Sequence, residues 1–366
     1  MKIAVQVRLL PNKQQADVLL ATLHICNRVA DDVSALAWER RVFGAFDLQK
    51  IAYGLCKESG LAAQASVRTI RKVADSYKLD RKVQRRFRAV SAQPFDDRCL
   101  SWRPDEIGNG GAVSIWTAAG RMKDLRFVGE ASQIALLRAH RQGESDLIFR
   151  DGKWFLSATC DLPDVFVAEP AGWLGVDLGI VNIATTSDGT RWSGKALNRH
   201  RHRQRRLRTK LQAKGTKSAK RLLKKRNRKE QRFATDVNHT ISKKIVAEAE
   251  RTGRGVAVEN LTGIRARARQ RKPQRATLHT WAFHQLGQHL AYKAKRAGVA
   301  FVQVDPRYTS QDCSECGYRD KKNRKNQAEF VCRGCGVVAH ADHNAAVNIA
   351  TRGDDRWAVV NRPHAA

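Results

Sequence analysis

The 366-residue sequence contains no apolar run of roughly 18 residues, so we expect no membrane-spanning helix and no membrane partner. Its first residues, MKIAVQVRLLPNKQQ, lack the apolar core and the small-residue cleavage site of a signal peptide. These two absences favour a cytoplasmic protein.

Acidic residues are scarce relative to basic ones. The chain has 35 Asp and Glu against 68 Lys and Arg, which gives a formal net charge of +33. Such an excess repels itself unless a polyanion neutralises it, and nucleic acid is the usual polyanion. A ribosome-type structural protein or a membrane-surface binder would share this charge, but we favour a nucleic-acid-binding protein.

The first half of the chain predicts a small β-barrel with a helical insertion. Apolar and polar residues alternate from 2 to 10, which indicates a strand, and helical periodicity follows from about 12 to 90. Residues 92 to 165 predict two hairpins, the second turning at Asp151 and Gly152. The first strand would open the barrel, and the helices would interrupt it.

The second half of the chain predicts an α/β layer. Residues 172 to 194 indicate two strands that meet near Gly179. An amphipathic helix ending near Gly253 leads into the short strand GVAVEN, and a helix over about 277 to 297 leads into VAFVQV. This alternation is typical of a partly parallel sheet covered by helices.

The eight cysteines form two groups. Four are scattered and predict buried, reduced thiols: Cys26, Cys56, Cys99 and Cys160. The other four form two C-x2-C pairs that predict a closed, structural Zn²⁺ site: Cys313, Cys316, Cys332 and Cys335. His340 is an alternative ligand, but four cysteines already complete a tetrahedral shell.

Three carboxylates lie in or next to predicted elements of the α/β layer. Asp177 lies in the apolar strand LGVDLGI, Glu259 ends GVAVEN, and Asp342 begins a helix after the last cysteine. Singly, Glu259 could pair with an arginine, and Asp342 could cap its helix. Together the three could hold two Mg²⁺ ions, with Mn²⁺ as a possible substitute, for phosphodiester hydrolysis.

The order Asp, Glu, Asp is that of RuvC-like nucleases on the ribonuclease H-like fold. Cut-and-paste transposases on that fold usually end with Glu. The motif GVDLG also occurs in actin-like ATPases, but no Gly-rich phosphate loop follows it here. We therefore favour a nuclease over an ATPase.

These motifs resemble the TnpB family of bacterial insertion sequences, which are compact relatives of type V CRISPR effectors. The segments that carry the resemblance occur in the family's order: RLLPNKQQADVLL, GVDLGI, AVENLTGI, TSQDCSECG, CRGCG and HADHNAAVNIA. The resemblance is specific over 1 to 20 and 172 to 351, and general over 21 to 165. Many relatives have Asp-Arg-Asp where this chain has His340-Ala341-Asp342, so the aligned ligand is retained.

The resemblance implies a fold class of α/β plus β-barrel, with a helical insertion in the barrel and a zinc ribbon inserted in a ribonuclease H-like (RuvC) nuclease domain. The implied domains are a wedge-type β-barrel (1–11 and 91–168), a helical recognition domain (12–90), a RuvC-like nuclease domain (169–310 and 337–353), a zinc ribbon (311–336) and a C-terminal tail (354–366).

The resemblance also implies an RNA-guided DNA endonuclease. Asp177, Glu259 and Asp342 would be the catalytic Mg²⁺ ligands of a single site that cuts both DNA strands. The partners would be an omega-type guide RNA from the end of the mobile element and double-stranded DNA beside a short motif, with one protomer per RNA.

Residues 195 to 232 form a basic tract with 18 Lys or Arg and one acid, Glu230. We expect it to contact the RNA scaffold or the guide–target duplex through backbone and shape. The contact candidates are Arg199, Arg203, Arg206, Lys210, Lys217, Arg221, Lys225 and Arg228. A second basic segment, Gly263–Arg275, predicts a loop that gates the site near Glu259.

Three alternatives remain open from the sequence. One is an RNA-guided DNA-binding regulator that is catalytically silent. Another is a transposase that joins DNA ends, which the Asp–Glu–Asp order and the lack of a Tyr nucleophile motif disfavour. The third is a miniature type V CRISPR effector, which gene neighbours would distinguish better than the chain itself.

Overall fold

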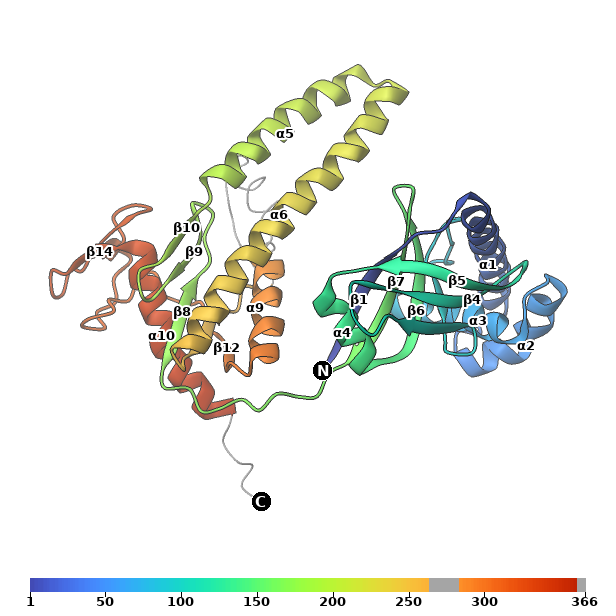
Figure 1. Ribbon diagram of the computed structural model, residues 1–366. Coiled ribbons are helices and arrows are strands. Elements are labelled where there is room, and N and C mark those ends of the chain that lie inside the picture. The colour runs from blue at the N-terminus through green and yellow to red at the C-terminus, as the bar shows by residue number, and fades with distance from the viewer. Residues whose placement is uncertain (263–282, 361–366) are drawn as a thin grey trace. The chain divides into compact units, whose positions relative to one another are not determined.

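The computed structural model describes residues 1–262 and 283–360, and the chain folds into two compact units, Met1–Pro163 and Asp164–Ala366 (Figure 1). Each unit has its own sheet and core. The predicted basic loop, Gly263–Arg275, lies outside the described residues, as does the predicted start of the helix at 277. None of the helices in the described ranges is both long and apolar enough to cross a bilayer.

The first unit contains an antiparallel sheet with the strand order β2-β6-β7-β1-β5-β4-β3. The predicted opening strand is confirmed as β1, and both predicted hairpins are confirmed as β4–β5 and β6–β7. The strands are β1 (Lys2–Leu9), β2 (Gln93–Phe95), β3 (Leu100–Pro104), β4 (Gly110–Thr117), β5 (Gly120–Val128), β6 (Arg141–Arg150) and β7 (Lys153–Asp161).

The turn of the second hairpin forms where the sequence predicts it. Asp151 and Gly152 have φ angles of 53° and 73°. Two consecutive positive φ angles are the mark of a type I′ turn, whose twist matches that of the flanking strands. The sequence analysis missed the helix α4 (Ala131–His140), which lies directly before β6.

The sheet of the first unit curls around one core. Its two terminal strands, β2 and β3, are not paired with each other. The indole of Trp102 on β3 nevertheless donates to the Ser145 hydroxyl on β6 at 3.3 Å. Apolar side chains from both ends of the sheet share a single buried cluster. The predicted barrel is therefore not closed by hydrogen bonds: it is a bent sheet whose terminal strands, β2 and β3, do not pair with each other.

The helical region predicted after β1 is confirmed, although the sequence did not predict its division into three helices: α1 (Lys13–Arg40), α2 (Ala45–Glu58) and α3 (Ala63–Leu79). A capping box starts α1, since the side chains of Asn12 and Gln15 each accept from the other's backbone N–H. The helices pack on a buried cluster that includes Tyr77, whose hydroxyl lies 2.9 Å from that of Ser34. This core is separate from that of the sheet.

The second unit contains a mixed sheet with the strand order β10-β9-β8-β11-β12. The pairs β10–β9 and β9–β8 are antiparallel, whereas β8–β11 and β11–β12 are parallel, as the α/β pattern predicts. The third strand, β10, was not predicted. The strands are β8 (Trp173–Asp177), β9 (Asn182–Thr186), β10 (Arg191–Ser193), β11 (Gly255–Glu259) and β12 (Phe301–Val304).

Helices cover both faces of this sheet. Leu174 and Val176 of β8 share a cluster with α6 and α9, whereas Trp173 packs with Ile349 of α10 on the other face. The predicted amphipathic helix is longer than expected, because it continues back into the basic tract as α6. The helices are α5 (Lys195–Lys214), α6 (Lys217–Arg251), α9 (Phe283–Ala297) and α10 (Ala341–Val360).

Gly175 allows α10 to lie directly on β8, and this gives a prediction. A Cβ at this position would lie 2.0 Å from the Ala346 carbonyl oxygen and 2.5 Å from the Ala350 nitrogen. Because both atoms are backbone, they cannot move aside, and we expect Gly175→Ala to lower the free energy of unfolding by about 3 kcal/mol. Urea denaturation measures this change.

Gly287 provides the matched control, because a Cβ there meets nothing within 4 Å. It lies inside α9, so Gly287→Ala should stabilise the protein by roughly 0.5–1 kcal/mol through helix propensity. Equal midpoints for the two variants would contradict the close packing of α10 on β8.

Candidate functional site

Asp177 and Glu259 end two adjacent parallel strands. Val176 pairs with Val258 in the register of β8 and β11, so the next residues, Asp177 and Glu259, lie side by side at the carboxyl ends. Side chains alternate between the faces of a strand, and both acids are therefore on the face that carries Gly175 and α10. The sheet thus brings together the two acids that the sequence separates.

Asp342 lies in the first turn of α10, against the same face of the sheet. Its side chain is 6% exposed. The Asn182 amide donates to one carboxylate oxygen at 2.9 Å, and the Arg324 guanidinium donates to the other at 3.1 Å. These hydrogen bonds connect the Asp342 carboxylate to β9 and to the cysteine-containing segment.

The negative charges of two of the acids act on the third, Asp177. Burial raises the pKa of Asp177 well above its ordinary value, and the negative charges of Glu259 and Asp342 raise it further. Burial also raises the pKa of Glu259, although the Thr309 hydroxyl donates to its carboxylate at 2.5 Å and opposes the shift. Such a concentration of partly buried negative charge is a feature of functional sites.

The sequence analysis missed Arg324, a residue that reaches this site from the cysteine-containing segment. Besides its contact with Asp342, its positive charge lowers the pKa of Asp177 and that of Glu259. It also missed Asn182 and Thr309, which hold the carboxylates of Asp342 and Glu259. No local pattern marks these three residues, because each acts on a partner distant in sequence.

Arg324→Gln should destabilise the metal-free protein at neutral pH by about 1–3 kcal/mol, because it removes the cation beside buried carboxylates. The loss should shrink at lower pH, where Asp177 and Glu259, whose pKa values are raised, take up protons. Denaturant unfolding at pH 5 and pH 7.5 measures both effects. Lys322→Gln removes the same charge from an exposed position and should leave the stability unchanged at both pH values.

The donor chemistry of the acid site fits hard divalent cations, since carboxylate oxygens are the ligands that Mg²⁺ and Mn²⁺ prefer. Burial and the charges of Glu259 and Asp342 raise the pKa of Asp177, and a bound cation would offset those charges. Among the described residues, the four cysteines are the one group of His, Cys, Asp or Glu with ligand atoms all within 4.8 Å. The three acids are thus more widely spaced than the cysteines.

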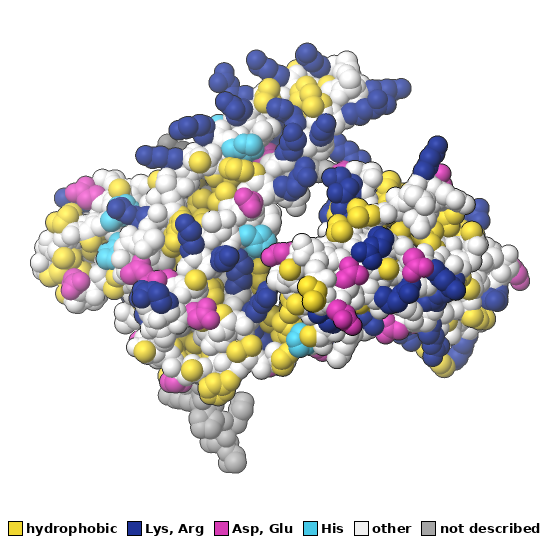
Figure 2. Space-filling model, in the orientation of Figure 1, with side chains coloured by type: hydrophobic (Ala, Val, Ile, Leu, Met, Phe, Trp, Pro, Cys, Tyr) yellow, Lys and Arg dark blue, Asp and Glu magenta, His cyan; other side chains and the backbone are white. Residues whose placement is uncertain are grey.

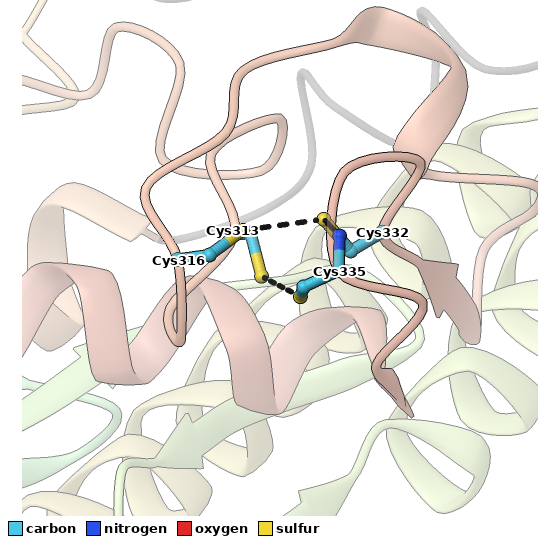
Figure 3. A group of neighbouring side chains, drawn as sticks. All are labelled: Cys313, Cys316, Cys332 and Cys335. Atoms are coloured by element: carbon cyan, nitrogen blue, oxygen red, sulfur yellow. Dashed lines mark hydrogen bonds between the residues drawn. The ribbon is translucent and has the colours of Figure 1, made fainter.

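The four predicted cysteines come together in the segment that precedes α10, which contains a short 3-10 helix (Lys321–Asn323) and the strands β13 (Glu329–Val331) and β14 (Val338–His340) (Figure 3). The sulfur atoms of Cys313 and Cys335 are 3.8 Å apart, and those of Cys316 and Cys332 are 3.6 Å apart. A tetrahedral Zn²⁺ with bonds of about 2.3 Å requires sulfur separations of about 3.8 Å.

Backbone groups support the thiolate form of Cys332. The N–H groups of Gly334 and Cys335 donate to the Cys332 sulfur at 3.3 and 3.4 Å and lower the pKa of its thiol. The geometry and the donors therefore fit a zinc ion. His340 is not part of the group; its Nδ1 accepts from the Asp342 backbone N–H at 3.2 Å.

The four scattered cysteines are free and buried, as predicted. Burial raises the pKa of Cys26 to about 12 and that of Cys56 to about 12. Their thiols therefore remain protonated and unreactive at neutral pH.

The basic tract forms the helical hairpin of α5 and the first half of α6, and Lys and Arg side chains gather along it (Figures 1 and 2). Gly215 makes the turn with φ of 64°, and Arg208 bonds to Glu230 across the two helices at 2.9 Å. Seven of the predicted contact residues are exposed: Arg199, Arg203, Arg206, Lys210, Lys217, Arg221 and Lys225. Arg228 lies in α6, and its side chain is outside the described part of the structure.

Two family models match successive parts of the chain. A family described as "Probable transposase" (OrfB_IS605) matches residues 161–265, and the "Cas12f1-like, TNB domain" matches residues 283–349. The first range contains Asp177 and Glu259, and the second contains the four cysteines and Asp342.

Curated relatives are similar to part of the chain. The CRISPR-associated endodeoxyribonuclease Cas12f1 of Sulfoacidibacillus thermotolerans is 43% identical over 125 residues, which are 34% of this chain and 28% of the relative. The TnpB-like protein MJ0751 of Methanocaldococcus jannaschii is 32% identical over 137 residues, which are 37% of this chain and 49% of the relative. These matches confirm the resemblance to the TnpB family.

The fold is similar to that of a solved structure, the Cas12f1–sgRNA–target DNA complex. The TM-score is 0.68 at 14% sequence identity, over 93% of this chain and 83% of the other. This likeness establishes a shared fold of mixed helices and sheets. The chain spans between about a quarter and a half of the length of the curated relatives named above.

Proposed function

We propose that the protein is an RNA-guided DNA endonuclease that binds a guide RNA and cuts double-stranded DNA beside a short motif. The observation that carries the proposal is the meeting of Asp177, Glu259 and Asp342 on one face of the mixed sheet. The names of the relatives support it, since Cas12f1 is called an endodeoxyribonuclease and its solved complex contains guide RNA and target DNA.

In this proposal the second unit is a ribonuclease H-like (RuvC) nuclease domain with an inserted zinc ribbon. The strand order β10-β9-β8-β11-β12, with one antiparallel and one parallel half, supports the fold. The first unit combines a wedge-type barrel with a helical recognition part. The site residues assigned are Asp177, Glu259 and Asp342 for two Mg²⁺, and Cys313, Cys316, Cys332 and Cys335 for Zn²⁺.

The chain's own residues prepare the site for cations. The strands β8 and β11 fix two carboxylates, while Asn182 and Thr309 hold Asp342 and Glu259 by hydrogen bonds. Bound Mg²⁺ would supply an activated water and stabilise the leaving oxygen of the phosphodiester. Arg324 balances the carboxylate charge and ties the cysteine segment to the site.

The α5–α6 hairpin is the proposed RNA-binding surface. We expect a combined variant to weaken RNA binding and to reduce the dependence of log K on log salt by about 2 to 3, since each lost phosphate contact removes 0.7 to 0.9 of the slope. The variant carries Arg203→Gln, Arg206→Gln and Lys210→Gln. Filter binding at several salt concentrations measures the slope.

A control with the same charge change carries Lys321→Gln, Lys322→Gln and Arg356→Gln, all at exposed positions away from the hairpin. Its slope should stay close to that of the unmodified protein. Equal losses in both variants would mean that total charge, and not the hairpin, governs binding.

The proposed function is tested first by the RNA that the protein holds. The protein should be expressed with its native flanking DNA, washed at high salt, and its bound RNA sequenced. One discrete species that ends in sequence from beyond the gene supports the proposal and supplies the guide for a cleavage assay. A smear of cellular RNA would contradict guided recognition.

The match to CRISPR-associated Cas12f1 supports a second candidate, a miniature CRISPR effector. The same experiment distinguishes the two candidates. RNA from the end of a mobile element favours the TnpB-like role, whereas RNA from a CRISPR repeat array favours the effector role.

A further inference from the structure

Thr185 of β9 has a buried hydroxyl without a hydrogen-bond partner among the described residues. The residue has 0% of its surface exposed, and its Oγ1 has no hydrogen-bond partner among the residues that the structure describes. A buried polar group without a partner costs about 1–3 kcal/mol, and folded proteins contain few of them. The neighbouring Thr186 differs, because its hydroxyl bonds to Asp188 and to the Thr190 carbonyl.

Thr185 lies directly opposite Asp177 in the antiparallel pair of β9 and β8. Opposite residues in such a pair project from the same face, with Cβ atoms about 5 Å apart. That face is the one covered by α10, as the packing of Gly175 on Ala346 shows. The Thr185 hydroxyl and the Asp177 carboxylate therefore lie next to each other, between the sheet and α10.

We propose that Thr185 is a positioning residue: its hydroxyl donates a hydrogen bond to the Asp177 carboxylate when that carboxylate holds a divalent cation. The inference rests on the proposed nuclease function and extends it to a residue outside the acid set. The backbone N–H of Leu178 also donates to Asp177. Thr185 would add a second donor and fix the orientation of the carboxylate.

The physical reason is general. Carboxylates that ligate metals are themselves held by hydrogen bonds, and losing such a partner weakens metal affinity or activity by 10- to 100-fold. Until the cation is bound, the hydroxyl weakens the fold. Once the cation is bound, it contributes to the site. The inference therefore predicts opposite effects of one substitution on stability and on metal binding.

Thr185→Val tests this, because valine has nearly the same shape and lacks the hydroxyl. The metal-free variant should be at least as stable to urea as the unmodified protein. Its affinity for Mn²⁺, measured by isothermal titration calorimetry on the full chain, should fall about 10- to 100-fold. Thr185→Ser retains the hydroxyl and should restore Mn²⁺ affinity to within about threefold of the original.

Thr186→Val is the matched control on the opposite face of β9. It removes a hydroxyl that is bonded, so it should lower stability and leave Mn²⁺ affinity unchanged. If Thr185→Val behaves in this same way, its hydroxyl is structural and the inference is wrong. Losses of both stability and affinity that serine does not restore would assign the effect to packing and also overturn it.

Asp177→Asn separates this inference from the proposed function. If Asp177→Asn abolishes Mn²⁺ binding and Thr185→Val leaves it intact, the inference fails and the nuclease site stands. If neither substitution changes Mn²⁺ binding, the proposed metal site fails, and the role of Thr185 fails with it.

Discussion

Replacing Asp177 by Asn is expected to abolish guided DNA cleavage while it stabilises the protein at neutral pH. A bound metal contributes several kcal/mol to the transition state, so the loss of one of its ligands should lower the cleavage rate by about a thousandfold or more. Guide RNA binding should be unchanged, because the basic hairpin is untouched. A plasmid cleavage assay with the co-purified RNA measures the rate.

The gain in stability follows from the raised pKa of Asp177. Burial and the neighbouring acids raise this pKa in the folded state, so the folded state binds the proton more tightly than the unfolded state does. The stability of the metal-free protein therefore falls as pH rises from the unfolded value, about 3.9, through the folded pKa. Asn carries no such proton, and the variant should lose this part of the pH dependence.

An exposed acid, Asp354, provides the control for Asp177. Asp354→Asn, on the exposed side of α10, should leave both cleavage and the pH dependence of stability unchanged. Full cleavage by Asp177→Asn would remove the acid site from the mechanism. A stability loss at neutral pH would show that the carboxylate has favourable contacts that outweigh its burial.

Loss of zinc should unfold the cysteine segment and inactivate the nuclease. A structural zinc contributes on the order of 10 kcal/mol to the folding of its domain. The segment is bound to α10, since the Asn344 amide donates to the Asp312 carbonyl and its oxygen accepts from Ser314. It also carries Arg324, which contacts Asp342. Its unfolding would therefore disturb the third carboxylate of the site.

Cys332→Ser tests this prediction, because the Cys332 sulfur accepts hydrogen bonds from the backbone N–H groups of Gly334 and Cys335. We expect one zinc per chain in the unmodified protein, a strong loss of zinc in the variant, and increased hydrogen exchange across residues 311–336. Elemental analysis and mass spectrometry measure these quantities. Cys160→Ala removes a buried thiol elsewhere and should retain the zinc. Full zinc content in Cys332→Ser would refute the assignment.

Local patterns were sufficient for most elements of the fold. Alternation identified β1, the Asp151–Gly152 pair identified a hairpin turn, and helical spacing identified the helical region that contains α1 to α3. The short elements α4 and β10 were missed because each is too brief to show a clear period. The join of the basic tract to the amphipathic helix was missed because charge, and not helical spacing, dominates that segment.

The residues of the candidate site also fall into those that the sequence predicts and those that it does not. The acids and cysteines are visible in the sequence because a carboxylate in an apolar strand or a C-x2-C pair is rare by chance. Arg324, Asn182 and Thr185 are ordinary in sequence, and their places depend on partners elsewhere in the fold. The chain has 68 basic residues, so nothing local distinguishes Arg324 from the others. Only the folded chain brings these residues together.

The spacing of the three acids has a consequence for synthesis on the ribosome. Glu259 follows Asp177 by 82 residues (259 − 177), and Asp342 follows Glu259 by 83 (342 − 259). At roughly 5–20 residues per second, the interval between the first and third acids is about 10 to 30 s. The basic hairpin is made within that interval, before Glu259 and Asp342. On the proposed function, a nascent chain acquires its RNA-binding surface before it is able to cut DNA.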